Sequence, residues 1–408
     1  MIKIFYNLSI KILNCLLLIS SFFNKKNKKI YEGRKNTFSY INKYIRSDEK
    51  IVWIHVSSVG EFEQAKPIID LIHKNYHYKI LVSYFSSSAE EEVKKYKKIN
   101  YNFYLVSDIK SNTEKLFKLL NPKIIIIVKY EFWINLIYTA KKYSVPIISV
   151  SSVFRSNQIY FLKIGLFFRN ALKNISLFLV QNEKSKVILN KINISQVEVI
   201  GDTRYDRVLN IYNNSKNISR IKDFINNKTT IVIGSSWKSD IEILRKEIER
   251  DLTDTKYIIA PHNIGINDIE YLENSFINDT IKFSELPQKN VRKRILIIDN
   301  LGMLSSLYKY CRIAFIGGGF RGALHNTLEA AVWDVPVIYG FHKNNLKFIE
   351  VKKLEKNSVG FPIRNGNEFK LIKNRVLKDR DIGKGGNSFI IKNSGATIKI
   401  NKFLSKYL

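Results

Sequence analysis

The feature that most constrains the fold is a double series of short Val- and Ile-rich runs separated by amphipathic stretches. Runs that are apolar on both faces are typical of parallel strands covered by helices on each side, so the alternation predicts doubly wound α/β sheets. We expect the first series of strands at residues 51–56, 79–84, 123–129, 146–152, 177–181 and 197–201, and the second at 229–234, 257–260, 294–299, 313–316 and 335–339.

A break between the two series predicts two domains. The chain has 408 residues, more than the roughly 250 to 300 at which a single core stops growing. Residues 212–228 are rich in Asn, Ser and Lys and contain no long apolar run. We therefore expect an N-terminal Rossmann-like domain over residues 31–215 and a C-terminal one over residues 216–408, facing each other across a cleft at the carboxyl ends of their strands.

The N-terminal segment, residues 1–30, is predicted to be a membrane anchor. Its apolar part is followed by a basic cluster, Lys25, Lys26, Lys28, Lys29, Arg34 and Lys35. This order predicts that the following domain stays in the cytoplasm. Because Lys11 and Asn14 shorten the clean apolar stretch below the ~20 residues that cross a bilayer, the anchor either spans the membrane or lies in its interface. A signal peptide is the alternative, but no small-residue cleavage site precedes the lysines.

The formal net charge of +31 is compatible with nucleic acid, an anionic membrane or a phosphorylated substrate as the partner. Lys, Asn and Ile are abundant throughout the chain, which indicates compositional drift and general membrane attraction. Zinc-finger spacing, an aromatic RNA-binding signature and a helix-turn-helix pattern are all absent from the sequence, so we expect no nucleic acid partner. Two cysteines, Cys15 and Cys311, imply no disulfide framework and fit a reducing compartment.

Two carboxylates follow strands of the first series. In IVWIHVSSVGEFEQ the strand runs through a turn that contains Ser58 and Gly60 into a helix that begins at or just after Glu61. There Glu61 either complements the helix dipole or accepts a proton from an attacking sugar hydroxyl. Glu131 follows the apolar run IIIIV in KYEFWIN. Its apolar neighbours mean that its charge needs a partner or exposure.

The strongest single signal is the segment IAFIGGGFRGALHNTLEAAVWDVPVIYG, residues 313–340. A strand ends before Gly317, Gly318 and Gly319, and a helix is expected to begin near Asn326. Free N–H groups at that helix start favour an anion, and three glycines in a row suggest that something approaches the backbone closely. His325 and Asn326 could bind phosphate oxygens, and Glu329 could accept from ribose hydroxyls. Asn326 and Glu329 also have the spacing of a capping box, which is compatible with ligand binding.

Three smaller features follow other strands. Arg204 lies in GDTRYDRV, Ser235 and Ser236 lie in GSSWKSD, and His262 lies in APHN. Each is by itself an ordinary turn, but all are expected near the same cleft.

Taken in order, these segments resemble the Kdo transferases, which use CMP-Kdo to glycosylate the lipid A precursor. The resemblance runs from about residue 30 to the C-terminus. SSVGE is similar to the family block whose glutamate is the general base, so the resemblance implies that role for Glu61, with Ser58 and Gly60 beside it. YEFW is similar to a block containing a second essential glutamate, Glu131. Arg155 in VFRSNQ loosely resembles a family arginine on the acceptor side.

On the donor side, GDTRYD resembles a family block with lysine at the position of Arg204, and GGGFRGALHNTLEAA resembles the glycine-rich loop and HNPLEP block. His262 stands where many members have an arginine, which removes a permanent charge. The resemblance implies the GT-B glycosyltransferase architecture and an inverting transfer of Kdo to lipid IVA at the cytoplasmic face of the inner membrane, whose anionic surface attracts the protein. We expect no metal and no cofactor besides the CMP-Kdo donor. Alternatives are a GT-B enzyme that uses a UDP-sugar, or a noncatalytic basic protein that binds membrane or RNA.

Overall fold

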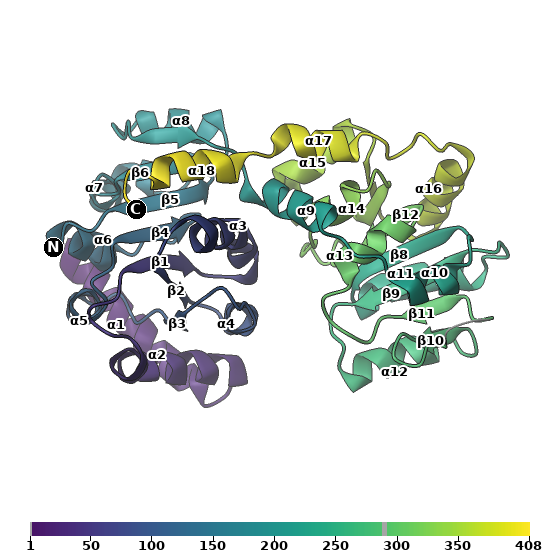
Figure 1. Ribbon diagram of the computed structural model, residues 1–408, viewed down its shortest axis with the longest axis horizontal. Coiled ribbons are helices and arrows are strands. Elements are labelled where there is room, and N and C mark those ends of the chain that lie inside the picture. The colour runs from purple at the N-terminus through teal and green to yellow at the C-terminus, as the bar shows by residue number, and fades with distance from the viewer. Residues whose placement is uncertain (1, 288–291) are drawn as a thin grey trace. The chain divides into compact units, whose positions relative to one another are not determined.

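The computed structural model describes residues 2–287 and 292–408, so residue 1 of the predicted anchor lies outside the described residues. The chain divides into two compact units. Unit 1 comprises Met1–Arg207 and Ser394–Leu408, and unit 2 comprises Val208–Asn393. Each unit contains, within the described residues, a seven-stranded sheet in which all paired strands are parallel. The predicted α/β fold class is therefore confirmed (Figure 1).

The sheet of unit 1 has the strand order β3-β2-β1-β4-β5-β6-β7. The chain runs outward from β1 to one edge and then returns to the other side of β1, so β1 and β4 are neighbours at the switch point where open α/β sheets bind ligands. The strands are β1 (Ile51–Val56), β2 (Lys79–Tyr84), β3 (Tyr101–Tyr104), β4 (Ile124–Val128), β5 (Ile147–Ser152), β6 (Leu177–Val180) and β7 (Val197–Val199).

Helices cover both faces of this sheet, and the first two precede it. The helices are α1 (Ile2–Ser21), α2 (Lys25–Tyr44), α3 (Val59–Asn75), α4 (Ser87–Lys94), α5 (Lys110–Leu120), α6 (Ile134–Lys142), α7 (Leu166–Leu172), α8 (Glu183–Asn190) and α18 (Ala396–Leu404), with 3-10 turns at Ile159–Phe161 and Lys163–Gly165. Helix α9 (Thr203–Asn213) contains the division between the units.

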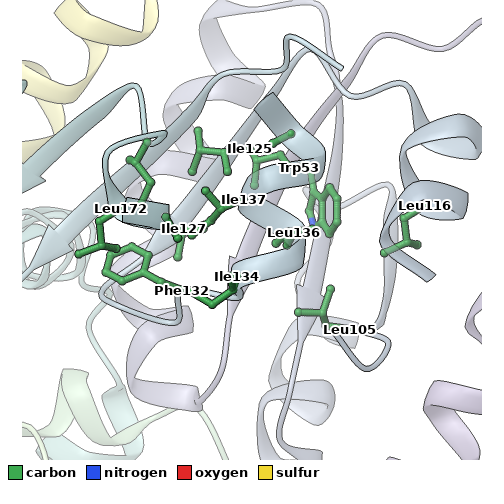
Figure 2. Close-up of a cluster of buried hydrophobic side chains, with 14 of the residues drawn as sticks. Trp53, Leu105, Leu116, Ile125, Ile127, Phe132, Ile134, Leu136, Ile137 and Leu172 are labelled. Atoms are coloured by element: carbon green, nitrogen blue, oxygen red, sulfur yellow. The ribbon is translucent and has the colours of Figure 1, made fainter. Parts of the chain in front are cut away.

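The alternating strand residues of unit 1 fill two separate cores. Trp53 and Ile125 point to one face, where they pack with residues of α5 and α6 such as Leu116 and Ile137 (Figure 2). Val52, Ile54 and Val56 belong to the core on the opposite face. Consecutive strand residues point to opposite faces of the sheet, and both faces are covered by apolar cores. The strands therefore appear in the sequence as continuous apolar runs.

Unit 2 has the strand order β10-β11-β9-β8-β12-β13-β14, in which β8 and β12 are the central neighbours. Its strands are β8 (Thr230–Ser236), β9 (Lys256–Pro261), β10 (Thr280–Lys282), β11 (Ile295–Ile297), β12 (Ile313–Ile316), β13 (Val337–Gly340) and β14 (Gly360–Ile363). Its helices are α10 (Ser219–Ile225), α11 (Lys238–Glu249), α12 (Ile266–Ser275), α13 (Leu304–Leu307), α14 (Leu328–Ala331), α15 (Ile349–Lys356), α16 (Gly366–Lys378) and α17 (Gly386–Asn393), with 3-10 turns at Tyr308–Tyr310 and Lys343–Lys347.

The C-terminal assignment needs correction. The second domain was predicted to span residues 216–408, whereas Ser394–Leu408 belongs to unit 1 and the division falls after Arg207. The reason is hydrophobic burial, because Ala396, Ile400 and Leu404 of α18 join the core that α3 covers.

Three strands were not expected from the sequence, namely β3, β10 and β14. All three are short and lie at sheet edges. Edge strands tolerate Asn, Lys and even Pro362 because one side of the ladder needs no partner, so they lack the apolar signature of central strands.

Candidate active site

Glu61 lies in the first turn of α3, directly after the central strand β1. Its side chain is 5% exposed. The Oε2 atom of Glu61 accepts hydrogen bonds from the backbone N–H of Ser57 at 2.5 Å and from the Ser57 hydroxyl at 2.6 Å. The helix therefore begins with its carboxylate folded back over the turn that precedes it, where the dipole favours negative charge.

Glu131 lies beside this carboxylate, as its position after the neighbouring strand β4 predicts. Burial first, and then the charge of Glu61, raise the pKa of Glu131, although a hydrogen bond with Ser57 opposes the shift. Ser57 thus contacts both carboxylates. The structure brings Glu61 and Glu131 together and adds Ser57, whereas Ser58 was the serine predicted from the sequence.

A strained turn presents Glu131. Lys129, at the end of β4, adopts the left-handed conformation with φ 65°, which costs a residue with a side chain roughly 1–2 kcal/mol. Its carbonyl accepts hydrogen bonds from the hydroxyls of Ser149 at 2.9 Å and Ser152 at 2.5 Å, both on β5. The neighbouring strand therefore holds the turn in a conformation that the local sequence does not favour.

The other predicted acceptor-side residues are less constrained. Ser58 is the N-cap residue of α3 but makes no side-chain capping bond. Gly60 is exposed, and a Cβ atom built on it would meet nothing within 4 Å. Arg155 is exposed in the loop after β5, where its backbone N–H bonds to Gln158.

Arg204 is held by an acidic neighbour at the start of α9, within unit 1. Its guanidinium pairs with Asp202 at 2.7 Å, and Asp202 also accepts from the Arg204 backbone N–H at 3.0 Å and from Gln64 at 2.9 Å. Burial alone would raise the pKa of Asp202, but the charge and hydrogen bonds of Arg204 outweigh it and lower that pKa. Arg204, which was predicted to bind the donor phosphate, is thus already paired with the carboxylate of Asp202.

In unit 2 the three glycines after β12 serve the packing of the chain against itself. A Cβ on Gly317 would lie 2.2 Å from the carbonyl oxygen of Ser235, and one on Gly319 would lie 2.5 Å from the backbone of Gly340. Gly318 has φ 80°, and a Cβ atom on it would lie 2.4 Å from the carbonyl oxygen of Ala323. The sequence argument for a close approach is confirmed, but the approaching group is the protein backbone.

Two N–H groups of this loop are also already bonded. Gly317 donates to the carbonyl of Gly234 at 2.8 Å, and Gly318 donates to Asp240 Oδ2 at 2.9 Å. Asp240 is fully buried in the first turn of α11 and accepts from the backbone of Trp237 as well. The expectation that these two N–H groups bind an anion is therefore corrected, because Gly234 and Asp240 occupy them.

A stack of rings lies next to the glycine loop. Trp237 stacks on His262 with centroids 4.2 Å apart, and His262 lies 4.6 Å from His325. The guanidinium of Arg321 covers the Trp237 ring at 4.4 Å. The residues predicted as donor ligands, His262 and His325, are therefore together, and Arg321 adds a cation that the sequence analysis did not select.

Both imidazoles favour the neutral form. Burial and the charge of Arg321 lower the pKa of His262, and burial with the nearby His262 lowers the pKa of His325 to about 4. The indole N–H of Trp237 donates to Nε2 of His325 at 3.2 Å. Because an indole only donates, the proton of neutral His325 is on Nδ1, where it can be given to a ligand.

The remaining predicted donor residues flank this stack. Asn326 accepts from the N–H of Leu328 and donates to Glu329 Oε1 at 3.0 Å, so the pair braces the start of α14. Ser235 is left-handed with φ 52°, and the hydroxyl of Ser236 is buried without a hydrogen-bond partner among the described residues. Over residues 2–287 and 292–408, no cluster of three or more His, Cys, Asp or Glu has metal-binding geometry.

Comparison with known proteins shows a similarity to one family. Residues 32–207, which include both glutamates, match the family described as 3-deoxy-D-manno-octulosonic-acid transferase (kdotransferase). A 3-deoxy-D-manno-octulosonic acid transferase of Aquifex aeolicus is 28% identical over 326 residues, which cover 78% of this chain and 83% of that protein. The chain is therefore similar to Kdo transferases over most of its length, and residues 32–207 match their family model.

Other similarities bear on the extent of the chain and on its fold. A bifunctional glycosyltransferase/methyltransferase of Fusobacterium nucleatum is 29% identical over 97% of this chain, and the chain spans 62% of that protein's length. The UDP-GlcNAc 2-epimerase of Neisseria meningitidis superposes with a TM-score of 0.59 at 15% identity, covering 88% of this chain and all of that one. At that identity the likeness shows the fold alone, the two-domain α/β arrangement of GT-B proteins.

Proposed function

We propose that the protein transfers Kdo from CMP-Kdo to a hydroxyl of lipid IVA, with inversion at C2 of Kdo, at the cytoplasmic face of the inner membrane. The observation that carries the proposal is the Glu61, Ser57 and Glu131 arrangement at the switch point of unit 1. It lies inside the segment that matches the Kdo transferase family.

In this proposal Glu61 accepts the proton of the acceptor hydroxyl while that oxygen attacks C2 and the bond from C2 to the phosphate oxygen of CMP breaks. Burial and the charge of Glu61 raise the pKa of Glu131, so this second acid is protonated more readily than a free glutamate. The Ser57 hydroxyl carries one proton, which it donates to Glu61. Ser57, which also hydrogen-bonds to Glu131, therefore links the proton acceptor to the second acid.

The leaving CMP gains negative charge, and unit 2 offers donors for it. The Arg321 guanidinium lies over the Trp237 ring, and His325 can donate from Nδ1. Arg321 therefore replaces, in this proposal, the charge lost where His262 stands at a position that is arginine in many relatives. The donors are fixed before the reaction, which is how electrostatic stabilisation lowers a barrier. No resident metal or cofactor takes part.

The N-terminal helices support the proposed location. Within the described residues, α1 is long and apolar enough to cross a membrane, and within it only Ile10 and Ser21 are buried. The basic residues of α2 follow at once. Basic residues beside an apolar segment add attraction to anionic lipid.

The test is the mass of the product after the full chain is incubated with lipid IVA and CMP-Kdo. We expect lipid IVA to gain one or more Kdo masses, and we expect excess EDTA to leave the rate unchanged. UDP-GlcNAc in place of CMP-Kdo is the matched donor control and should give no product. Transfer from the UDP-sugar alone would overturn the proposal in favour of a different envelope glycosyltransferase.

A further inference from the structure

An apolar pocket opens beside the candidate active site, between α1, α2 and the loops after β2 and β4. Its volume is about 830 Å³. Leu13, Leu17 and Phe23 come from the α1 side, and Phe85 and Trp133 come from the sheet side. A volume of this size holds a hydrocarbon chain with room to spare, since ligand pockets commonly measure ~300–1,000 Å³.

The wall that α1 forms is fixed to unit 1 by polar contacts. The Tyr6 hydroxyl donates to Asp108 at 2.6 Å, Ser107 donates to Asn14 at 2.5 Å, and Asn135 donates to Asn7 at 2.9 Å. These polar side chains of α1 therefore face the protein, while many of its apolar side chains, such as Leu8, Leu13 and Leu16, remain exposed. Asn14, which interrupts the apolar stretch in the sequence, is one of the docking residues.

A cation lies in the pocket without a carboxylate partner among the described residues. Arg34 of α2 covers the Phe85 ring at 4.5 Å, and its Nε atom is buried with no hydrogen-bond partner. Burial lowers the pKa of Arg34 to about 10, so the group is still charged at neutral pH. Asp108 also lines the pocket, but its oxygens already accept from Tyr6 and from two backbone N–H groups. A buried charge of this kind favours an anionic ligand.

The pocket and the carboxylate pair are linked through neighbouring loops. Phe85 stacks on Trp133 with centroids 5.8 Å apart and an interplanar angle of 14°. Trp133 follows Glu131 by two residues, and the N–H of Ser86, next to Phe85, donates to the carbonyl of Ser57 at 3.1 Å. The loop after β4 thus carries both Glu131 and Trp133, and the loop after β2 carries Phe85 and bonds to the turn before Glu61.

We propose that this pocket binds an acyl chain of the lipid acceptor and that Arg34 pairs with an anionic group of the same lipid. The inference rests on the proposed function, because it takes the acceptor to be an anionic lipid. Burial of the chain between α1 and the Phe85 and Trp133 rings gives the affinity. The ion pair with Arg34 then sets which part of the headgroup faces Glu61.

The test uses fluorescence of the full chain with phosphatidic acid that carries brominated acyl chains, in phosphatidylcholine vesicles and without any sugar donor. The chain has four tryptophans, of which Trp53 is buried in the sheet and Trp237 and Trp333 belong to unit 2. Bromine quenches an indole on contact, so we expect quenching that disappears in Trp133→Phe. Quenching that is equal in wild type and Trp133→Phe would overturn the proposal.

A matched pair of variants separates the pocket from simple adsorption of α1 to the vesicle. Leu13 and Ile12 are adjacent and similarly exposed, at 59% and 51%, but only Leu13 lines the pocket. We expect Leu13→Gln to raise the lipid concentration for half-quenching at least threefold and Ile12→Gln to change it by less than half that factor. Equal effects would show that α1 only adsorbs to lipid, which contradicts an acyl pocket.

A third variant tests the anion. Arg34→Gln should abolish the preference for brominated phosphatidic acid over brominated phosphatidylcholine while Trp133 is still quenched. An unchanged preference would remove Arg34 from the site. Because no donor is present, quenching as predicted together with failed transfer to lipid IVA would count against the proposed function and leave the pocket standing.

Discussion

The two units place an acidic side chain at the same point of the same fold and use it differently. Glu61 lies in the first turn of the helix after β1, and Asp240 lies in the first turn of the helix after β8. In unit 1 the strand before this helix, β1, pairs with β4, and in unit 2 the equivalent strand, β8, pairs with β12. The loop after β4 or β12 supplies the group that lies next to the acid. In unit 1 that loop brings a second acid, whereas in unit 2 it brings the N–H of Gly318.

The difference shows how burial and partners decide what a carboxylate does. Asp240 is fully buried and bridges two backbone N–H groups, so it ties the glycine loop to α11. Among the described residues, the Glu61 carboxylate accepts hydrogen bonds from Ser57 in the turn before it and has the Glu131 carboxyl beside it. Asp240 therefore braces a loop, whereas Glu61 lies next to a second acid, which is the arrangement that the proposed proton transfer needs.

The largest effect is expected from Glu61→Gln. The amide has the same size but cannot take the proton of the acceptor, so the transfer rate should fall by about 10²- to 10⁴-fold. The measurement is kcat with CMP-Kdo and lipid IVA, with the free energy of unfolding measured in urea alongside. A variant that turns over like the wild type would show that Glu61 only complements the helix dipole.

Asp240→Asn is the matched substitution in unit 2. It weakens the acceptor for the N–H groups of Gly318 and Trp237, so we expect the free energy of unfolding to fall by about 1–3 kcal/mol. If Asp240→Asn left stability intact and abolished transfer, the two acids would not differ in the way described.

An intermediate effect is expected from the glycines. Gly317→Ala places a methyl group against the backbone of Ser235 and should lower the free energy of unfolding by about 1–3 kcal/mol. Gly60→Ala is the control, since its Cβ would meet nothing within 4 Å and alanine favours a helix by about 1 kcal/mol over glycine. Urea denaturation of both variants measures the contrast, and equal destabilisation would contradict it.

The smallest effect is a change in titration. The negative charge of Glu61 is the second cause, after burial, of the raised pKa of Glu131. Glu61→Gln removes that charge and should move the Glu131 pKa downward, while burial keeps it above the ordinary value. The measurement is the carboxyl carbon chemical shift of labelled glutamate as a function of pH, with Glu131→Gln used to assign the signal. A pKa that stays or rises would show that the two carboxylates do not interact.

Much of this organisation could be predicted from the sequence, because central strands and their following loops carry strong local signals. The apolar runs before Glu61 and before Glu131 identify two strands, and a parallel sheet brings the ends of neighbouring strands together. Which strands are neighbours is a long-range property, so the contact through Ser57 could not be read from spacing. The same holds for Asp240 and Arg321, both of which lie inside motifs that were recognised.

The roles of the glycines and of Arg204 show a second limit. A glycine run indicates that another group approaches the backbone closely. The approaching groups are Ser235 and Gly340, which are distant in the sequence and therefore could not be named from it. The charge of Arg204 is evident from the sequence, but its pairing with Asp202 depends on the buried position of that aspartate. The edge strands and α18 were missed because short or amphipathic segments depend on distant partners for their burial.

The return of α18 to unit 1 affects how the chain can be made and divided. Unit 2 is one uninterrupted stretch, so it can be excised or exchanged by two cuts, whereas unit 1 is assembled from two pieces. During synthesis the ribosome delivers all of unit 2 before it delivers Ala396, Ile400 and Leu404, which complete one core of unit 1. Unit 1 is therefore the first unit to be started and the second to be completed. Its core beneath α3 lacks the side chains of α18 until residues 394–408 have been synthesised.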